Sequence, residues 1–112
     1  MSNKAGTVYV NADRQTAAVF QLSSKAARLL LPIYCNIDDK NQIDIKILEE
    51  KIGWVKDDRT WKKYWNELQE RKILVFLDQN IVMVSPYECY REGINHLALL
   101  AQWRLLQHEP VS

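Results

Sequence analysis

The chain has 112 residues and a formal net charge of +1, with 47% hydrophobic and 26% charged residues. This length supports one hydrophobic core rather than two, and the composition is globular rather than disordered or fibrous. The longest apolar run, residues 29–33, is far shorter than the roughly 20 residues of a membrane-spanning helix, and no apolar signal region follows the polar N-terminus. We therefore expect a soluble, cytoplasmic, single-domain protein with no membrane partner.

The cysteines and histidines do not form a recognisable metal-binding pattern. Cys35 and Cys89 lie far apart in mostly apolar surroundings, and His96 and His108 do not have the spacing that a zinc site needs. We expect two buried, reduced thiols, with no metal and no other cofactor.

A short strand and a largely apolar helix are predicted for the first third of the chain. Residues 7–10 alternate β-branched and aromatic side chains, which indicates a strand, and a polar turn follows at residues 11–14. Residues 16–22 fit either a second strand or the approach to a helix. Ser23 and Ser24 are good helix N-caps. Behind them, apolar side chains recur at helical spacing, and Pro32 predicts a kink near residues 28–32.

Two more helices are predicted in the middle of the chain. A very short strand at residues 42–43 precedes a helix that Asp44 caps and Gly53 ends. Its expected buried stripe is Ile45, Leu48 and Ile52, and its expected water-facing residues are Lys46, Glu49, Glu50 and Lys51. A turn then leads into a third helix, capped by Asp57 or Asp58 and running to about Lys72. The expected inner side of that helix carries Trp61, Trp65 or Tyr64, and Leu68.

The last third predicts a β-hairpin and a final helix. Two β-rich runs, residues 73–77 and 81–84, flank the polar turn 78–80, and Ser85-Pro86 ends the second run. Residues 87–93 form a connector and residues 94–107 a helix. The predicted fold class is α+β, mainly α: a winged helix-turn-helix with an extra N-terminal strand and a C-terminal helix. Within one domain we distinguish a lead-in (1–22), the winged-helix core (23–86), and the connector with the last helix (87–112).

Several motifs between Phe20 and Gly93 point to a known family. They are LSSKAARLLL at 22–31, NID at 36–38, NQI at 41–43, Leu48, Ile52-Gly53, WNELQERKIL at 65–74, VMVSP at 82–86 and YREG at 90–93. This region, about two thirds of the chain, resembles the winged-helix domain of RepL-type plasmid replication initiators and related small plasmid or phage proteins. The resemblance implies a DNA-binding protein in plasmid or phage replication initiation or in transcriptional regulation.

The winged-helix plan places the third helix in the major groove of double-stranded DNA. Arginine can pair with guanine, asparagine with adenine, and lysine with phosphates. The side chains expected to contact DNA are Lys56, Arg59, Thr60, Lys62, Lys63 and Asn66, with Gln79 and Asn80 at the hairpin tip. The basic residues of the N-terminal stretch could add phosphate contacts. The alternative is that these charges form an ordinary solvated helix face.

Large apolar side chains provide candidates for protein contacts. Trp61 and Trp65 are expected to pack on the core, with an exposed aromatic platform as the alternative, whereas Trp54 in the turn is a better candidate for a partner contact. The last helix presents a stripe of Ile94, Leu97, Ala98, Ala101 and Leu105, from which we expect a homodimer. Two alternatives remain: this helix folds back onto its own domain, or the protein binds another protein and does not read DNA sequence.

No catalytic site is expected. The three glycines are scattered and form no phosphate-binding loop. No Cys–His or Ser–His arrangement has a readable local context. The paired carboxylates, such as Asp38-Asp39 and Glu49-Glu50, are sequence neighbours that do not converge on one substrate.

Overall fold

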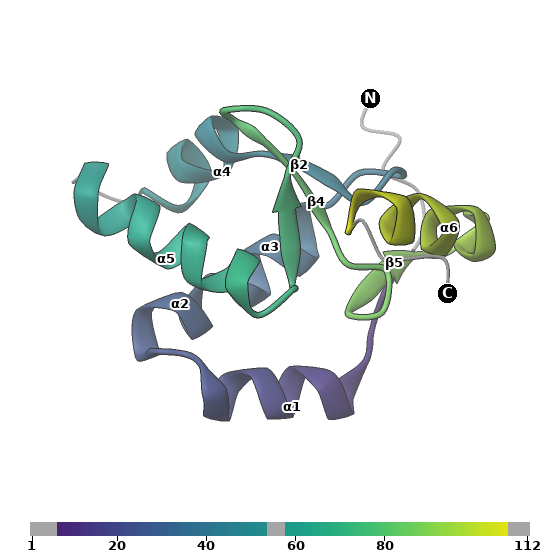
Figure 1. The fold of residues 1–112 in the computed structure, drawn as a ribbon, viewed down its shortest axis with the longest axis horizontal. Coiled ribbons are helices and arrows are strands. Elements are labelled where there is room, and N and C mark those ends of the chain that lie inside the picture. Colours follow the sequence, from purple (N-terminus) through teal and green to yellow (C-terminus); the bar gives the residue numbers. More distant parts are fainter. Residues whose placement is uncertain (1–6, 54–57, 108–112) are drawn as a thin grey trace.

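The computed structural model describes residues 7–53 and 58–107, without the side chains of residues 58–61. This part of the chain combines helices with short antiparallel strands, so the fold class is α+β. Figure 1 shows helices α2 to α5 on one side of a small sheet, with a second strand pair and α6 on the other side. No helix in the described ranges is long and apolar enough to cross a bilayer.

The N-terminal segment contains a helix where the sequence pattern left a strand and a helix as alternatives. Strand β1 (Val8–Val10) leads directly into α1 (Ala12–Gln21), so the polar turn expected at residues 11–14 was wrong. Asn11 is the N-cap of this helix, and its side-chain oxygen accepts a hydrogen bond from the Arg14 amide at 3.2 Å. Within the helix only Ala18 is buried, so the apolar periodicity that reveals most helices is missing here.

The kink expected near Pro32 is confirmed as a break between two helices. α2 (Ser24–Arg28) starts at Ser23, whose hydroxyl accepts a hydrogen bond from the Ala26 amide at 3.3 Å. Leu29 separates it from α3 (Leu30–Asn36). Pro32 lies in the first turn of α3, where its missing N–H does least harm to the helix. Together α2 and α3 supply the fully buried centre of the core: Ala26, Leu29, Leu30, Ile33, Tyr34 and Ile37.

Strand β2 (Gln42–Asp44) and helix α4 (Ile45–Ile52) follow the prediction closely. The Asp44 carboxylate accepts hydrogen bonds from the amides of Lys46 and Ile47 at 2.9 and 3.3 Å. Gly53 ends the helix in the left-handed conformation at φ 64°. Glu49 was expected to face water but is buried. It lies four residues after Ile45, on the same helical stripe as Leu48.

Helix α5 (Asp58–Glu70) stops two residues before the predicted end at Lys72. Lys72 adopts a left-handed conformation with φ 59°. This conformation lets the Ile73 amide donate to the Leu68 carbonyl at 3.0 Å and the Lys72 amide donate to the Gln69 carbonyl at 2.9 Å. Paired hydrogen bonds of this kind are a common way for a helix to end.

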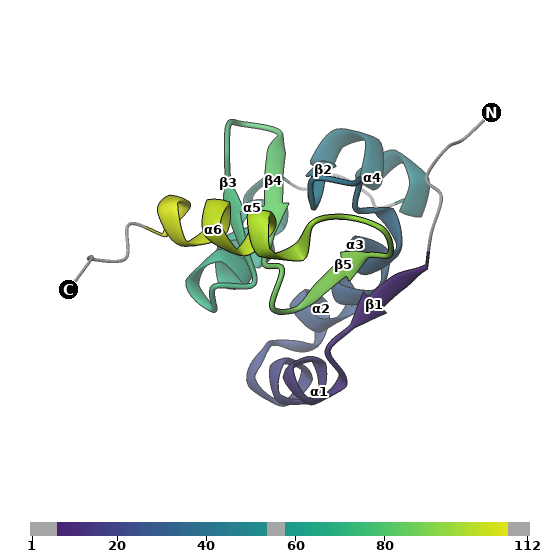
Figure 2. The ribbon, with the colours of Figure 1, turned by 90° about the vertical axis from the view of Figure 1, so that its right-hand side faces the viewer.

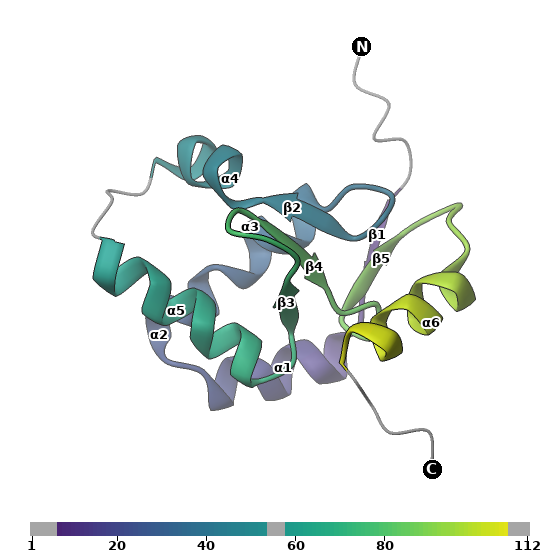
Figure 3. The same cartoon turned by 45° about the horizontal axis from the view of Figure 1, so that its top comes forward.

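The predicted hairpin is confirmed and belongs to a three-stranded antiparallel sheet. β3 (Leu74–Phe76) and β4 (Ile81–Val84) pair with each other, and β4 lies between β3 and β2. Successive side chains of a strand point to opposite faces. Val82 and Val84 therefore join the core formed by the helices, while Met83 faces α6 (His96–Leu106) and packs with Leu99 and Trp103. Figure 3 shows the hairpin between α5 and α6.

The connector predicted at residues 87–93 contains a strand, which corrects the prediction. β5 (Cys89–Arg91) pairs antiparallel with β1, with Tyr9 opposite Tyr90. Figure 2 shows these two strands side by side next to α6, with β1 leading to α1. A three-residue strand whose partner lies at the other end of the chain leaves little local pattern to detect.

Arg91 anchors this two-stranded ribbon to the end of α3. Its side chain is buried and donates hydrogen bonds from Nε to the Ile37 carbonyl and from Nη2 to the Cys35 carbonyl, the latter at 3.3 Å. A cation at the C-terminus of a helix is also favoured by the helix dipole. The ribbon is thus held against the helices by a buried charge.

Asn41 joins the two sheets to each other. It is fully buried and has a left-handed backbone with φ 59°. The nitrogen of its side-chain amide donates to the carbonyls of Val84 and Cys89 at 3.2 and 2.7 Å. The backbone carbonyl of Asn41 accepts from the Val84 amide at 2.7 Å. One side chain therefore links the end of β4 to the start of β5.

We predict that Asn41→Gly destabilises the protein by about 2 kcal/mol, because glycine keeps the left-handed backbone but leaves two buried carbonyls without their donor. The free energy of unfolding in urea measures this change. Lys72→Gly is the matched control at the other non-glycine left-handed position among the described residues, where the exposed side chain makes no hydrogen bond with them. Equal effects of the two substitutions would contradict a role for the Asn41 side chain.

Candidate nucleic-acid interface

Helix α5 separates apolar from cationic side chains. Trp65 and Leu68 are buried in the core and Tyr64 is half-buried. Lys62, Lys63 and Asn66 are exposed on the outer side of the same helix. The structure therefore brings together three of the side chains expected to contact DNA.

The two lysines on this face are not neutralised within the described part of the chain. Neither Lys62 nor Lys63 forms an ion pair with a carboxylate of any described residue. Two acids border the shallow hollow that the lysines line with Asn66, namely Glu67 and Glu70. Glu67 is engaged elsewhere, because its two oxygens accept hydrogen bonds from the Ser23 amide at 2.7 Å and from the Ser23 hydroxyl at 2.8 Å.

The hydrogen bonds between Glu67 and Ser23 could not be predicted from the sequence. In the sequence, Glu67 is an acid four residues after Lys63. Its carboxylate instead holds the N-terminus of α2 against α5, where anions are favoured by the exposed amides and the helix dipole. Of the two acids at this hollow, only Glu70 is exposed and without a described partner.

Other expected DNA contacts lie outside the described residues. Lys56 belongs to residues 54–57, as does Trp54, the expected partner contact. Arg59 and Thr60 lie on the backbone of α5, but their side chains are outside the description. The same holds for the side chain of Trp61.

The hairpin tip presents one of its two expected contacts to solvent. Gln79 is exposed, whereas Asn80 is half-buried and its carbonyl accepts a hydrogen bond from the Ile45 amide at 2.7 Å. The turn is closed by Asp78, whose side chain accepts from the amides of Asn80 and Ile81 at 2.8 and 3.0 Å. The tip is therefore tied to the start of α4.

The outer face of α6 is apolar and uncovered in this chain. Leu97 and Leu105 are each 77% exposed, and Ala98 and Ala101 between them are exposed as well. Ile94, which was expected to share this face, is half-buried and packs with the cluster around Met83. The alternative that α6 folds onto its own domain is therefore half right: Leu99 and Trp103 do so, while the opposite side stays exposed.

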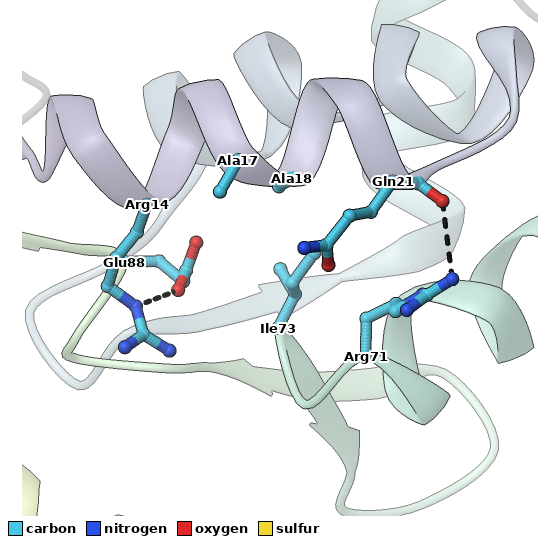
Figure 4. A pocket seen from close by; sticks show the side chains of 7 residues that line it. All are labelled: Arg14, Ala17, Ala18, Gln21, Arg71, Ile73 and Glu88. Atoms are coloured by element: carbon cyan, nitrogen blue, oxygen red, sulfur yellow. Dashed lines mark hydrogen bonds and ion pairs between the residues drawn. The ribbon is translucent and has the colours of Figure 1, made fainter.

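A hollow of about 190 Å³ lies between α1 and the turn that joins α5 to β3. Figure 4 shows Arg14 and Glu88 at one end, Arg71 and Gln21 at the other, and small or apolar side chains between them. Arg14 forms an ion pair with the buried Glu88, and Arg71 donates to the Gln21 carbonyl at 3.3 Å. Both arginines thus hold α1 against the rest of the protein.

The strongest pKa shifts belong to groups inside the core. Burial raises the pKa of Tyr34 and of Cys89, and the negative charge of the nearby Glu88 raises both pKa values further. Both groups therefore stay protonated at neutral pH. Among the described residues no group of three or more His, Cys, Asp or Glu side chains could hold a metal ion.

Comparisons of the chain with models of protein families, with curated proteins and with solved structures found no significant match.

The two thiols differ in exposure, which corrects the expectation that both are buried. Cys35 lies on the exposed side of α3, whereas Cys89 is enclosed in the core. The thiolate is the reactive form of cysteine, and a raised pKa lowers its population at any given pH.

We predict that a disulfide reagent such as dithionitrobenzoate labels one thiol per native chain at pH 8, and two after unfolding in guanidinium. Cys35→Ser should remove the native reaction, and rapid labelling of both thiols in the native protein would contradict the enclosure of Cys89.

Proposed function

We propose that this chain is a non-catalytic winged helix-turn-helix protein that binds double-stranded DNA, in plasmid or phage replication initiation or in transcriptional regulation. The order of elements supports this proposal: an apolar first helix pair, β2, α4, α5, and a hairpin whose second strand lies between the other two. In such a fold the helix before the hairpin is the one that enters the major groove.

The observation that carries the proposal is the exposed trio of Lys62, Lys63 and Asn66 on α5. Ammonium groups without carboxylate partners bind phosphates at little cost, because no existing ion pair has to break. The Asn66 amide can form two hydrogen bonds with the edge of an adenine. On this proposal Arg59, Thr60 and Lys56 belong to the same DNA-binding surface, and Gln79 contacts the backbone from the hairpin tip.

We also propose that the protein is a homodimer through α6. Leu97 and Leu105 lie four residues before and after Ala101, so a two-fold axis at Ala101 would place each leucine against the other leucine of a second, antiparallel α6. The small side chains of Ala98 and Ala101 would let the two helices approach closely. A two-fold dimer is also the form in which many helix-turn-helix proteins bind symmetric sites.

A protein-binding role without DNA recognition is the second candidate. The exposed leucines of α6 favour it, because uncovered apolar faces commonly mark partner surfaces. The two candidates differ in how steeply affinity depends on salt, because phosphate contacts release the condensed counterions of DNA, whereas an apolar protein contact does not.

We predict that the double substitution Lys62→Glu and Lys63→Glu weakens binding to a labelled DNA duplex of mixed sequence at least tenfold. Fluorescence anisotropy in low salt measures the affinity, and thermal unfolding should be unchanged because both side chains are exposed. The matched control is Lys40→Glu with Lys51→Glu, which changes net charge equally on a different surface. Unchanged duplex binding by the α5 variant would rule out this face.

A salt titration of the wild-type complex separates the two candidate functions. For DNA binding the logarithm of the affinity falls with the logarithm of salt concentration, with a slope of about −0.9 per phosphate contact. If the chain binds no duplex even at the lowest salt, the protein-binding role is favoured.

We predict that Ala101→Glu converts the dimer into a monomer, because it places two carboxylates next to each other at the proposed two-fold axis. Size-exclusion chromatography with light scattering measures the mass. Gln102→Glu adds the same charge at a neighbouring exposed position of α6 and should leave the dimer intact. A wild-type chain that is monomeric at all concentrations tested would exclude the dimer.

A further inference from the structure

Three aromatic rings form a continuous array on the face of the protein that carries β1, β5 and the start of α6. Tyr9 and Tyr90 are paired across the two strands, and their ring centroids are 5.5 Å apart at an angle of 51°. Tyr90 in turn stacks on His96, with centroids 4.0 Å apart and planes 24° from parallel. The strand pairing and the helix start thus fix the three rings in a defined order.

The array borders a hollow of about 300 Å³, which Tyr87 also lines. This volume is at the lower end of the range for small-molecule sites, roughly 300–1,000 Å³. Tyr9 is 45% exposed, and Tyr87, Tyr90 and His96 are each half-buried. Ring surface is therefore accessible from solvent, although the rings are held in place by their neighbours.

Polar contacts orient two of the three rings, those of His96 and Tyr9. The His96 Nε2 atom lies 2.9 Å from the Pro86 carbonyl, and the Tyr9 hydroxyl donates to Glu92 at 3.2 Å. Side chains that are already ordered lose little conformational entropy when a ligand binds, which favours recognition.

Two arginines contact Tyr87, which lines the hollow. The Arg14 guanidinium is 5.5 Å from the centre of the Tyr87 ring. Arg104 donates hydrogen bonds from Nε and Nη2 to the Tyr87 hydroxyl at 3.2 and 3.1 Å. Of the nearby acids, Glu88 is paired with Arg14 and Glu92 accepts from Tyr9. The site thus combines planar aromatic surface with two guanidinium groups, of which that of Arg14 is shared with Glu88.

We propose that this hollow binds a nucleotide, with its base against the tyrosine and histidine rings and its phosphate toward Arg14 and Arg104. Bases stack on tyrosine and histidine without sequence preference, and arginine provides both phosphate pairing and cation–π attraction. A base inside a duplex cannot reach such a site, so the ligand is a free nucleotide or a nucleotide of a single strand. This activity is separate from the proposed duplex binding by α5 and does not depend on it.

The proposal is tested with two probes, thymidine 5′-monophosphate and a labelled oligothymidylate. In NMR spectra, either probe should shift the ring signals of Tyr9, Tyr87, Tyr90 and His96, while signals of α5 stay in place. Ring-signal shifts with the mononucleotide and the oligonucleotide indicate a nucleotide site, and shifts with the oligonucleotide alone indicate a single-strand site. Both results support the proposal, and the absence of ring shifts with either probe overturns it.

Substitutions identify the aromatic surface as the cause. Tyr9→Leu and Tyr87→Leu keep apolar bulk but remove the ring, and each should weaken oligothymidylate binding about tenfold. Tyr9→Phe keeps the ring and should bind like wild type. Phe20→Leu removes a ring that is 84% exposed on α1, away from the hollow, and should have no effect. Equal loss in Tyr9→Phe and Tyr9→Leu, or in Phe20→Leu, would overturn the proposal.

The test also separates this site from the duplex-binding face. The double variant Lys62→Glu with Lys63→Glu should lose the duplex but still shift the tyrosine ring signals when thymidine 5′-monophosphate is added. Tyr87→Leu should show the opposite behaviour. Parallel loss of both activities in each variant would mean that there is only one binding surface, and would overturn a separate nucleotide site.

Discussion

The side-chain amide of Asn41 donates to two carbonyls, those of Val84 and Cys89, which belong to different sheets. The three-stranded sheet positions the hairpin and α5, and the β1–β5 ribbon positions α1 and the aromatic array. Asn41 therefore fixes one half of the molecule relative to the other. Its left-handed backbone is tolerated because asparagine is among the few side chains that adopt this conformation at low cost. Arg91 reinforces the junction from the other side by binding the carbonyls at the end of α3.

The sheet separates two surfaces with different chemistry. On one side, Val82 and Val84 meet the helical core from which α5 presents Lys62 and Lys63. On the other, Met83 meets Leu99 and Trp103 of α6, which leaves the leucines of the outer face uncovered. Because neighbouring residues of one strand point to opposite faces, β4 serves both surfaces at once. β4 therefore packs both on the core that carries the proposed DNA-binding helix and on the proposed dimer helix.

Charge on α5 shows why a site is harder to infer than a fold. The sequence gives the spacing of Lys62, Lys63 and Asn66, and helical periodicity alone places them opposite Trp65 and Leu68. It does not reveal that Glu67 bonds to Ser23, more than 40 residues earlier in the chain. Nor does it reveal that Tyr9, Tyr90 and His96 stack, because that array requires a strand pairing between the two ends of the chain. Partners of this kind arise from tertiary contacts, which no local pattern records.

The sequence by itself determined the elements that depend on neighbouring residues: the break near Pro32, the Asp44 cap, the Gly53 end and the hairpin around residues 78–80. Each is governed by backbone sterics or by hydrogen bonds within a few residues. Only the tertiary structure decided that residues 12–21 are helical, that residues 89–91 form a strand, and that α5 ends at Glu70. In the first case the helix has no apolar stripe to reveal it, and in the second the strand depends on a partner from the other end of the chain. In the third case, Lys72 adopts a left-handed backbone conformation, which lets Ile73 enter the core. Burial of the Ile73 side chain compensates for the backbone strain at Lys72.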